Sequence, residues 1–289
     1  MKTNVVFLGC ERVPVSSTDD THWMQSLQSR GFSVSEVSWT ENIEKFPKQG
    51  VCLLRTPWDY FDHLSEFLAK LQQIESRGLA VLNPVDVVQR NIDKAYLYEF
   101  SQSGIATVPS WCPGLDQQSL EQFLDHQSAE EYIVKPRVGA GGIGFQRLSP
   151  QQLKTWYQSE FDPDRPVFVQ PVLKTIATTG ETSLVFSMGR LTHAVRKLPK
   201  QGEIRIQEEW GGSTALYEPT EKETEFAQNV VERMASDLLY SRVDLVLTES
   251  GDPMLMELEL IEPSLYFRAR PDVVEIYSDA LDQKLSDLN

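Results

Sequence analysis

The chain has 289 residues, of which 40% are hydrophobic and 24% are charged, and its formal net charge at pH 7 is -15. Such a chain can bury a sizeable core and has room for two or three lobes. The negative charge repels nucleic acid and anionic membrane, which argues against a broad phosphate-binding face but allows a local nucleotide pocket. No apolar run reaches the ~20 residues that span a bilayer, and the first apolar run is too short for a signal peptide. We therefore expect a cytoplasmic protein whose partners are neither nucleic acid nor membrane.

The three cysteines, Cys10, Cys52 and Cys112, are far apart in the sequence and form no CxxC pair. This spacing predicts neither a disulfide framework nor a zinc site. Cys10 and Cys52 lie in apolar, strand-like runs, where a cysteine behaves as a small hydrophobe.

Strand and helix patterns alternate in the first third of the chain. The segments that read as strands are 4–10, 32–39, 51–56 and 81–84. Between them, residues 19–31 and 63–78 have apolar positions at helical spacing, and each of these segments ends in glycine. The alternation predicts a parallel, doubly wound α/β lobe with a boundary near Asn83 and Pro84.

The rest of the chain predicts a different architecture. Residues 85–104 read as one amphipathic helix, and after Glu130 strands are joined by glycine-rich turns. One long helix is expected at 219–238, followed by a hairpin that turns at 250–252 and a short helical tail. The predicted strands lie at 131–136, 144–148, 167–173, 183–197 and 203–210. The expected class is therefore α/β together with α+β lobes.

A glycine-rich loop follows Lys135, in which Gly139, Gly141 and Gly144 satisfy G-x-G-x-x-G. A dinucleotide fingerprint needs a helix after the loop, whereas a strand and turn are predicted here, and the Gly-Lys-Ser/Thr of a P-loop is missing. A strand–loop–strand flap could instead bring backbone N–H groups onto ATP phosphates, because glycine allows close approach and positive φ. Lys135 would add a positive charge beside those phosphates. A plain surface hairpin remains the alternative for this segment.

Glu257 and Glu259 are two residues apart on a predicted strand, so their carboxylates project to the same face. Asp244, on the preceding strand, would face them across the hairpin. Three oxygen donors on adjacent strands suit Mg²⁺ that bridges ATP phosphates. An exposed strand face with solvated acids is the alternative explanation.

Basic residues at Arg196, Lys197, Lys200 and Arg205 precede the glycine pair at 211–212. They could neutralise the charge of a transferring phosphate, or they could form an ordinary solvated strand face.

Six segments, in this order along the chain, resemble those of the ATP-grasp superfamily, in its glutathione-synthetase-like branch and especially among the cycloserine-forming ligases. They are RTPWDYFD, LNPVDVVQRNIDKAYL, VKPRVGAGGIGF, GETSLVFSMGRLTHAVRK, EIRIQEEWGG and the pair RVDLV…MELELIEPSL. The resemblance implies a three-lobe ATP-grasp fold with an N-terminal α/β domain at 1–90. It implies a subdomain with the glycine loop at 91–172 and one with the metal site at 173–289, with ATP held between these two.

The resemblance also implies roles for individual residues. Lys94 and Lys135 would contact the nucleotide phosphates, and Gly139, Gly141, Gly142 and Gly144 would cover them. The hinge that reads adenine would comprise Gln170, Pro171, Val172 and Leu173, with Glu181 near the ribose or substrate. Arg205 would stabilise an acyl-phosphate. Lys197, from the basic group described above, is the second catalytic candidate. Asp244, Glu257 and Glu259 fall on the Mg²⁺ ligands, although relatives often have asparagine at the position of Glu259.

The activity implied is that of an ATP-dependent ligase, which converts a carboxylate into an acyl-phosphate and joins it to an amine, releasing ADP and phosphate. An intramolecular cyclo-ligase and a non-catalytic ATP-binding regulator are the alternatives. The substrate is expected to be small and amino-acid-like, and the resemblance suggests a homodimer.

The expected substrate residues follow a buried strand, at the end where open α/β sheets place ligands. Arg55 could hold a carboxylate and Asp59 an amine, while Trp58 could contact substrate or plug the space between lobes. Arg268 is a further candidate. The histidines at 22, 63, 126 and 193 are expected to be structural or exposed.

Overall fold

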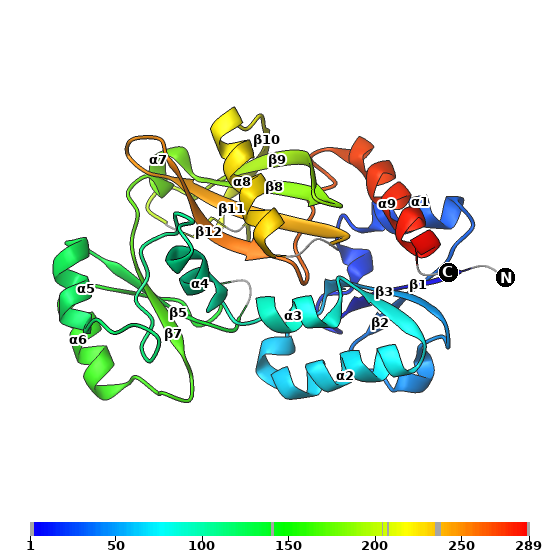
Figure 1. Ribbon diagram of the computed structural model, residues 1–289, viewed down its shortest axis with the longest axis horizontal. Helices are drawn as coiled ribbons and strands as arrows, with labels where there is room; N and C mark the ends of the chain where they lie inside the picture. Colours follow the sequence, from blue (N-terminus) through cyan, green and yellow to red (C-terminus); the bar gives the residue numbers. More distant parts are fainter. Residues whose placement is uncertain (1–2, 140–141, 204, 207, 235–237, 288–289) are drawn as a thin grey trace.

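The computed structural model describes residues 3–139, 142–203, 205–206, 208–234 and 238–287, which form three sheets (Figure 1). The first sheet is parallel, in the order β2-β1-β3-β4. Its strands are β1 (Asn4–Gly9), β2 (Ser33–Ser38), β3 (Gly50–Thr56) and β4 (Leu79–Leu82). The predicted parallel α/β lobe is therefore confirmed.

Helices cover both faces of this sheet, which explains why its central strands are continuously apolar. Val5 and Phe7 of β1 pack with Trp23 of α1 (Thr21–Ser29). The alternate residues, Val6 and Leu8, pack with Phe67 of α2 (Leu64–Ser76).

The last helix, α9 (Val274–Asp287), packs beside α1 on this first lobe (Figure 1). Tyr277 and Leu281 are fully buried there, and Arg30 pairs with carboxylates of α9. The short tail expected from the sequence is thus a 14-residue helix that closes one face of the N-terminal sheet.

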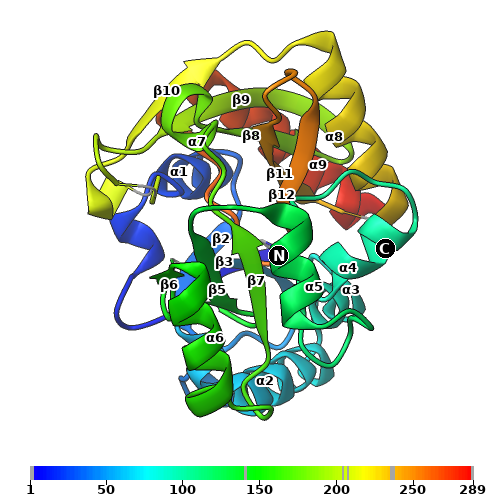
Figure 2. The same ribbon diagram turned by 90° about the vertical axis from the view of Figure 1, so that its left-hand side faces the viewer.

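The second sheet is antiparallel, in the order β6-β5-β7. It contains β5 (Tyr132–Pro136), β6 (Gln146–Leu148) and β7 (Val167–Pro171). Helices α5 (Leu120–Gln127) and α6 (Pro150–Ser159) pack against one face of it (Figure 2). The sequence reading overlooked α6, although Ser149 and Gln152 form a capping box at its start.

The third sheet is antiparallel, in the order β10-β9-β8-β11-β12, and α8 (Glu221–Met234) packs against it. The strands are β8 (Glu181–Ser187), β9 (Arg190–Leu198), β10 (Ser213–Tyr217), β11 (Tyr240–Leu247) and β12 (Pro253–Glu259). A four-residue helix, α7 (Ile176–Thr179), precedes β8. The strand predicted at 203–210 was wrong, because Glu208–Trp210 form a 3-10 turn and the edge strand begins only at Ser213.

The single helix predicted at 85–104 is divided into α3 (Val85–Asn91) and α4 (Tyr96–Gln102). Between them, Lys94 donates its backbone N–H to the carbonyl oxygen of Arg137 at 3.0 Å. The carboxylate of Asp93 binds the Arg137 guanidinium and accepts the N–H of Ala95. These contacts compete with helical hydrogen bonds and fix Lys94 at the break.

Buried polar side chains join the first lobe to the third sheet. The Asn83 amide donates to the carbonyl oxygens of Tyr240 and Leu260, at 2.9 and 2.7 Å. Asn91 donates to the carbonyl oxygen of Leu258. These amides therefore pair backbone groups that would otherwise be buried and unsatisfied.

Cys10 and Cys52 are buried, as expected for small hydrophobes, and Cys112 is buried as well. In the part of the chain that the structure describes, no helix is both long and apolar enough to cross a membrane.

Candidate active site

Strands β11 and β12 form the wall of the candidate site. Their antiparallel register places Asp244 opposite Glu257 and Arg242 opposite Glu259. The prediction that Asp244 faces the acidic pair across the hairpin is confirmed. Leu258, between the two glutamates, points to the opposite face and is buried in the core.

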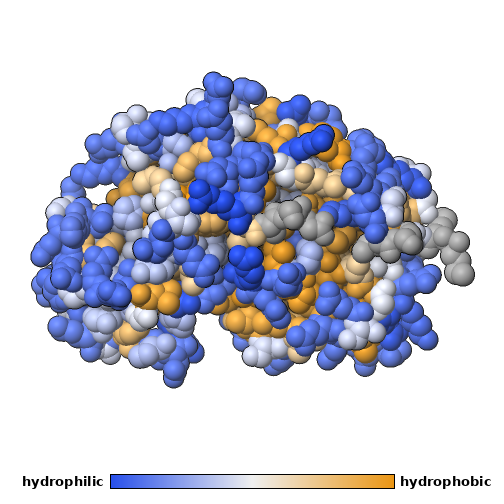
Figure 3. All heavy atoms as spheres, in the orientation of Figure 1, coloured by the Kyte–Doolittle hydropathy of each residue, from blue (hydrophilic) through white to orange (hydrophobic). Residues whose placement is uncertain are grey.

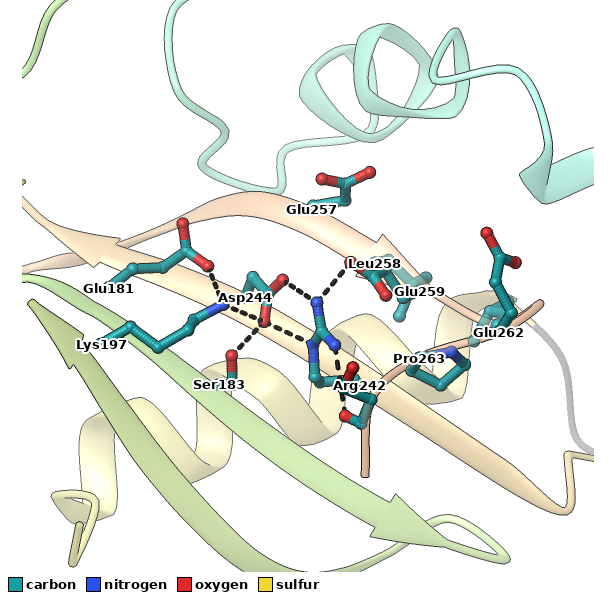
Figure 4. A network of polar contacts seen from close by, with 12 residues as sticks. Glu181, Ser183, Lys197, Arg242, Asp244, Glu257, Leu258, Glu259, Glu262 and Pro263 are labelled. Carbon is teal, nitrogen blue, oxygen red and sulfur yellow. Dashed lines mark hydrogen bonds and ion pairs between the residues drawn. The ribbon is translucent and has the colours of Figure 1, made fainter. Parts of the chain in front are cut away.

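Arg242 binds two of these carboxylates, as Figure 4 shows. Its Nε and Nη2 donate to Oδ1 and Oδ2 of Asp244 at 3.0 and 2.9 Å, and Nη2 also pairs with Glu259. The sequence reading missed Arg242, although a basic residue two positions before Asp244 on a strand must share its face.

Lys197 connects the neighbouring strands to the same network (Figure 4). Its Nζ lies 2.5 Å from Oε1 of Glu181 and 3.6 Å from Oδ1 of Asp244. Ser183 donates to Asp244 at 2.5 Å. Cross-strand pairing explains the grouping, because Glu181 lies opposite Lys197 and Ser183 lies opposite Asp244.

Lys94 links the glycine-rich loop to β12. Its Nζ donates to the carbonyl oxygen of Gly139 at 2.7 Å and lies 3.1 Å from Oε1 of Glu257. Lys135, on β5, is half-buried beside it. Burial and the charge of Lys94 lower the pKa of Lys135, against the opposing effect of Glu257. Two lysines and a glutamate thus meet where the second and third sheets approach each other.

Burial and charge pairing act against each other on the acids of the site. Burial alone would raise the pKa of Asp244, but Arg242 and Lys197 outweigh it and hold the pKa well below its ordinary value. For Glu257, Lys94 and Lys135 likewise overcome burial and lower the pKa. Burial prevails at the other two acids, raising the pKa of Glu181 to about 7 and of Glu259 to about 8.

The donor chemistry of Asp244, Glu257 and Glu259 suits a hard divalent cation. Among the described residues, however, no set of three His, Cys, Asp or Glu side chains converges as a metal site. Arg242 and Lys94 instead neutralise these carboxylates. Binding of Mg²⁺ would therefore require Glu257 or Glu259 to exchange its side-chain cation for the metal.

The glycine-rich loop runs from β5 into β6, which confirms the strand–loop–strand arrangement and rejects a dinucleotide fingerprint. Gly142 and Gly144 have φ of 71° and 76°. A Cβ on Gly144 would lie 2.8 Å from Cγ of Pro136, so a side chain there would require one of the two residues to shift. Gly141 lies outside the described residues.

The expected adenine hinge follows the second sheet. Strand β7 ends at Pro171, and the side chain of Gln170 is buried and donates to Oγ of Ser110 at 2.8 Å. The backbone N–H of Val172 donates to the carbonyl oxygen of Glu131, and Leu173 is half-buried. An adenine-binding role for this hinge stays a prediction.

Arg55 is fully buried, and its guanidinium donates to both oxygens of Asp20 at 3.2 Å. It also donates to the carbonyl oxygen of Pro263 at 2.6 Å. These bonds occupy the guanidinium, so the structure does not support the expected contact between Arg55 and a substrate carboxylate.

Two other predicted site residues, Arg205 and Arg268, have partners outside the network around Asp244. Arg205 pairs with Glu203 at 2.6 Å and lies 3.6 Å over the ring of Trp210, in contacts separate from the Lys197 network. Arg268 is exposed and pairs with Glu208.

The last two predicted substrate residues, Trp58 and Asp59, lie just beyond the end of β3. Asp59 accepts a hydrogen bond from the indole of Trp39 at 2.6 Å, and the indole of Trp58 donates to the carbonyl oxygen of Glu262 at 3.2 Å. Trp58 therefore joins the first lobe to the segment after β12.

The chain has two antiparallel sheets and a glycine-rich strand–loop–strand, and one sheet face carries a row of carboxylates and cations. This combination is that of an ATP-grasp ligase. Residues 93–264 match the family described as "Prokaryotic glutathione synthetase, ATP-grasp domain", and the chain belongs to this family. Residues 5–83 match the "D-cycloserine synthetase DcsG, N-terminal domain".

The similarity to known proteins covers almost the whole chain. The cycloserine biosynthesis protein DcsG of Streptomyces lavendulae is 25% identical, across 91% of this chain and 92% of that protein. The crystal structure of D-cycloserine synthetase DcsG has a TM-score of 0.82 at 24% identity, covering 98% and 99% of the two chains. The D-alanine–D-alanine ligase of Bacillus anthracis complexed with ATP has a TM-score of 0.68 at 17% identity, covering 98% and 95%. The predicted three-lobe ATP-grasp fold is confirmed, whereas the boundaries at 90 and 172 stay predictions.

Proposed function

We propose that this ligase uses ATP to activate the carboxylate of a small amino-acid-like molecule and joins the product to an amine. The observation that supports it best is the row of side chains on β8, β9, β11 and β12, in which Lys197 and Arg242 flank Asp244. Buried cations fixed on strands are suited to stabilising charge that develops during phosphoryl transfer.

In the first step, an oxygen of the substrate carboxylate forms a bond to the γ-phosphorus of ATP while the bond from that phosphorus to the bridging oxygen of ADP breaks. Lys94 and Lys135 would bind the phosphates beneath the glycine-rich loop, and Lys197 would face the transferring group. Mg²⁺, which hard carboxylate donors suit, would be held by Asp244, Glu257 and Glu259 and would neutralise phosphate charge.

In the second step, the amine nitrogen attacks the acyl carbon, the C–N bond forms, and inorganic phosphate leaves with the bonding electrons. The amine loses a proton to solvent. No protein nucleophile is required, so the chemistry demands orientation and charge stabilisation rather than a covalent enzyme intermediate.

The test is ADP and phosphate release from ATP and Mg²⁺ in the presence of single amino acids and pairs of them. We expect Glu257→Gln to lower kcat about a hundred-fold or more, because it removes one of the carboxylates that would hold the Mg²⁺ needed to neutralise phosphate charge. Glu249→Gln, on the exposed turn of the same hairpin, is the matched control and should retain wild-type turnover. Release of AMP and pyrophosphate would contradict the mechanism, and ATP binding without turnover for any carboxylate would favour a regulator.

The second candidate function is intramolecular ligation, in which the amine and the carboxylate belong to one molecule. The match to DcsG proteins, which includes the N-terminal lobe, favours it. Mass spectrometry distinguishes the two functions, because a cyclised product is lighter than its single substrate by one water.

A further inference from the structure

Glu262 lies between the nucleotide side of the site and the first lobe. It follows β12, three residues beyond Glu259, and its backbone carbonyl accepts the indole N–H of Trp58. Trp58 is two residues beyond the end of β3 of the parallel sheet. Glu262 therefore lies near the carboxyl end of that sheet, where open α/β folds bind their ligands.

The carboxylate of Glu262 differs from its neighbours in its partners. Within the described parts of the chain, Asp244 and Glu259 pair with Arg242, Glu257 pairs with Lys94, and Glu262 is in no ion pair within 4.0 Å. The side chain of Tyr60, which is itself 3% exposed, lies beside it and is neutral, because burial raises the pKa of its hydroxyl well above the ordinary value. Figure 4 shows the Glu262 carboxylate directed away from Arg242, to the same side of β12 as Glu257.

The cations nearest to Glu262 are committed elsewhere. Lys94 binds Glu257 and the loop carbonyl of Gly139, and Arg55 binds Asp20. Glu262 is only 9% exposed as a residue, and burial raises its pKa to about 7. A buried carboxylate without a cation is unfavourable, and a cation bound beside it offsets the lost hydration.

We propose that Glu262 binds the ammonium group of an amino-acid substrate and thereby selects for substrates that carry one. This rests on the proposed ligase function and specifies its substrate class. The carboxylate supplies the negative charge that the ammonium group would pair with. An ammonium group also fits the location, since the transferring phosphate would lie toward Glu257 and the substrate toward the first lobe.

The experiment uses the full chain with Mg²⁺ and a non-hydrolysable ATP analogue. The standard L-amino acids, their D-enantiomers and the des-amino acid of the tightest ligand are titrated calorimetrically, and turnover with ATP is measured in parallel. We expect Glu262→Gln to weaken amino-acid binding and raise its KM about ten- to a hundred-fold, as for loss of one charged hydrogen bond. The KM for ATP should not change.

Glu262→Asp keeps the charge and should recover part of the affinity, whereas Glu249→Gln should bind like wild type. The des-amino acid should bind wild type and Glu262→Gln equally weakly. Unchanged amino-acid affinity in a folded Glu262→Gln protein would overturn the proposal, even if turnover persists. So would a change in Mg²⁺ dependence alone, or failure of the wild-type protein to bind any amino acid. Glu262-dependent binding without any turnover would instead retain this proposal and reject the ligase function.

Discussion

Replacing Arg242 with methionine should destabilise the fold strongly. The side chains of Arg242 and Asp244 are 8% and 4% exposed, and Glu259 is 27% exposed, so solvent screens the pairs little. The substitution removes the bidentate partner of Asp244 and the ion-pair partner of Glu259. Removing one member of a buried ion pair costs about 3–5 kcal/mol, and Asp244 keeps only part of its compensation through Lys197 at 3.6 Å. We expect a loss near 3 kcal/mol.

The measurement is the free energy of unfolding from urea titration, followed by tryptophan fluorescence. Glu259→Gln alone should cost about 1 kcal/mol, because Arg242 retains Asp244. The double variant should be less destabilised than the sum of the single variants by about 1–3 kcal/mol, since the contact between Arg242 and Glu259 can be lost only once. Arg190→Met, at an exposed position of β9, is the control and should stay within about 0.5 kcal/mol of wild type.

A cost below about 1 kcal/mol for Arg242→Met would refute this reasoning. Strict additivity of the two substitutions would refute it as well, because it would mean that Arg242 and Glu259 do not share a stabilising interaction. Mg²⁺ provides an independent check. If Asp244 and Glu259 bind the metal, Mg²⁺ with ATP should restore more stability to Arg242→Met than to wild type.

Burial lowers the pKa of His193 to about 4, below its unfolded value of about 6.5. The unfolded chain therefore binds more protons at this residue between these values, and the contribution of His193 to stability falls by about 2 kcal/mol from pH 7 to pH 5; the difference between wild type and His193→Gln in urea titrations should change by that amount. Tyr277→Ala should cost about 3–5 kcal/mol because the ring is fully buried between α9 and the first sheet. Arg30→Ala should cost at most about 1 kcal/mol, since its partner carboxylates are exposed. Gly144→Ala should lower stability by about 1 kcal/mol and raise the KM for ATP, because of its positive φ and its contact with Pro136.

The wall of the site could be predicted from the sequence because local periodicity determines it. Alternation along 253–259 places Glu257 and Glu259 on one face, and the turn near Gly251 brings Asp244 opposite. Lys94 could be predicted as a phosphate-binding residue only through the family resemblance. Its position depends on the break between α3 and α4, which a long-range bond to the carbonyl oxygen of Arg137 stabilises. Apolar spacing at 85–104 is indistinguishable from that of one continuous helix.

Contacts across the chain explain the other differences. The pairing of Arg55 with Asp20 joins the end of β3 to the start of α1, and no local pattern contains that information. The same holds for α9, whose buried Tyr277 finds its partners on the first lobe. Arg205 lies in a shared segment and pairs locally with Glu203, so its role in stabilising an acyl-phosphate stays a prediction.

Arg55 and Glu262 illustrate how charge pairing, rather than residue type, separates a structural role from a functional one. Both are buried near the end of β3, and an arginine there is an obvious ligand for a substrate carboxylate. Arg55, however, has a bidentate carboxylate and two backbone carbonyls as partners, so binding a substrate would first require breaking these bonds. Glu262 has no ion-pair partner within 4.0 Å among the described residues and would gain one from a bound ammonium group. We therefore expect substrate selectivity near the end of β3 to depend on Glu262, which has no ion-pair partner among the described residues, rather than on Arg55, whose donors are already hydrogen-bonded.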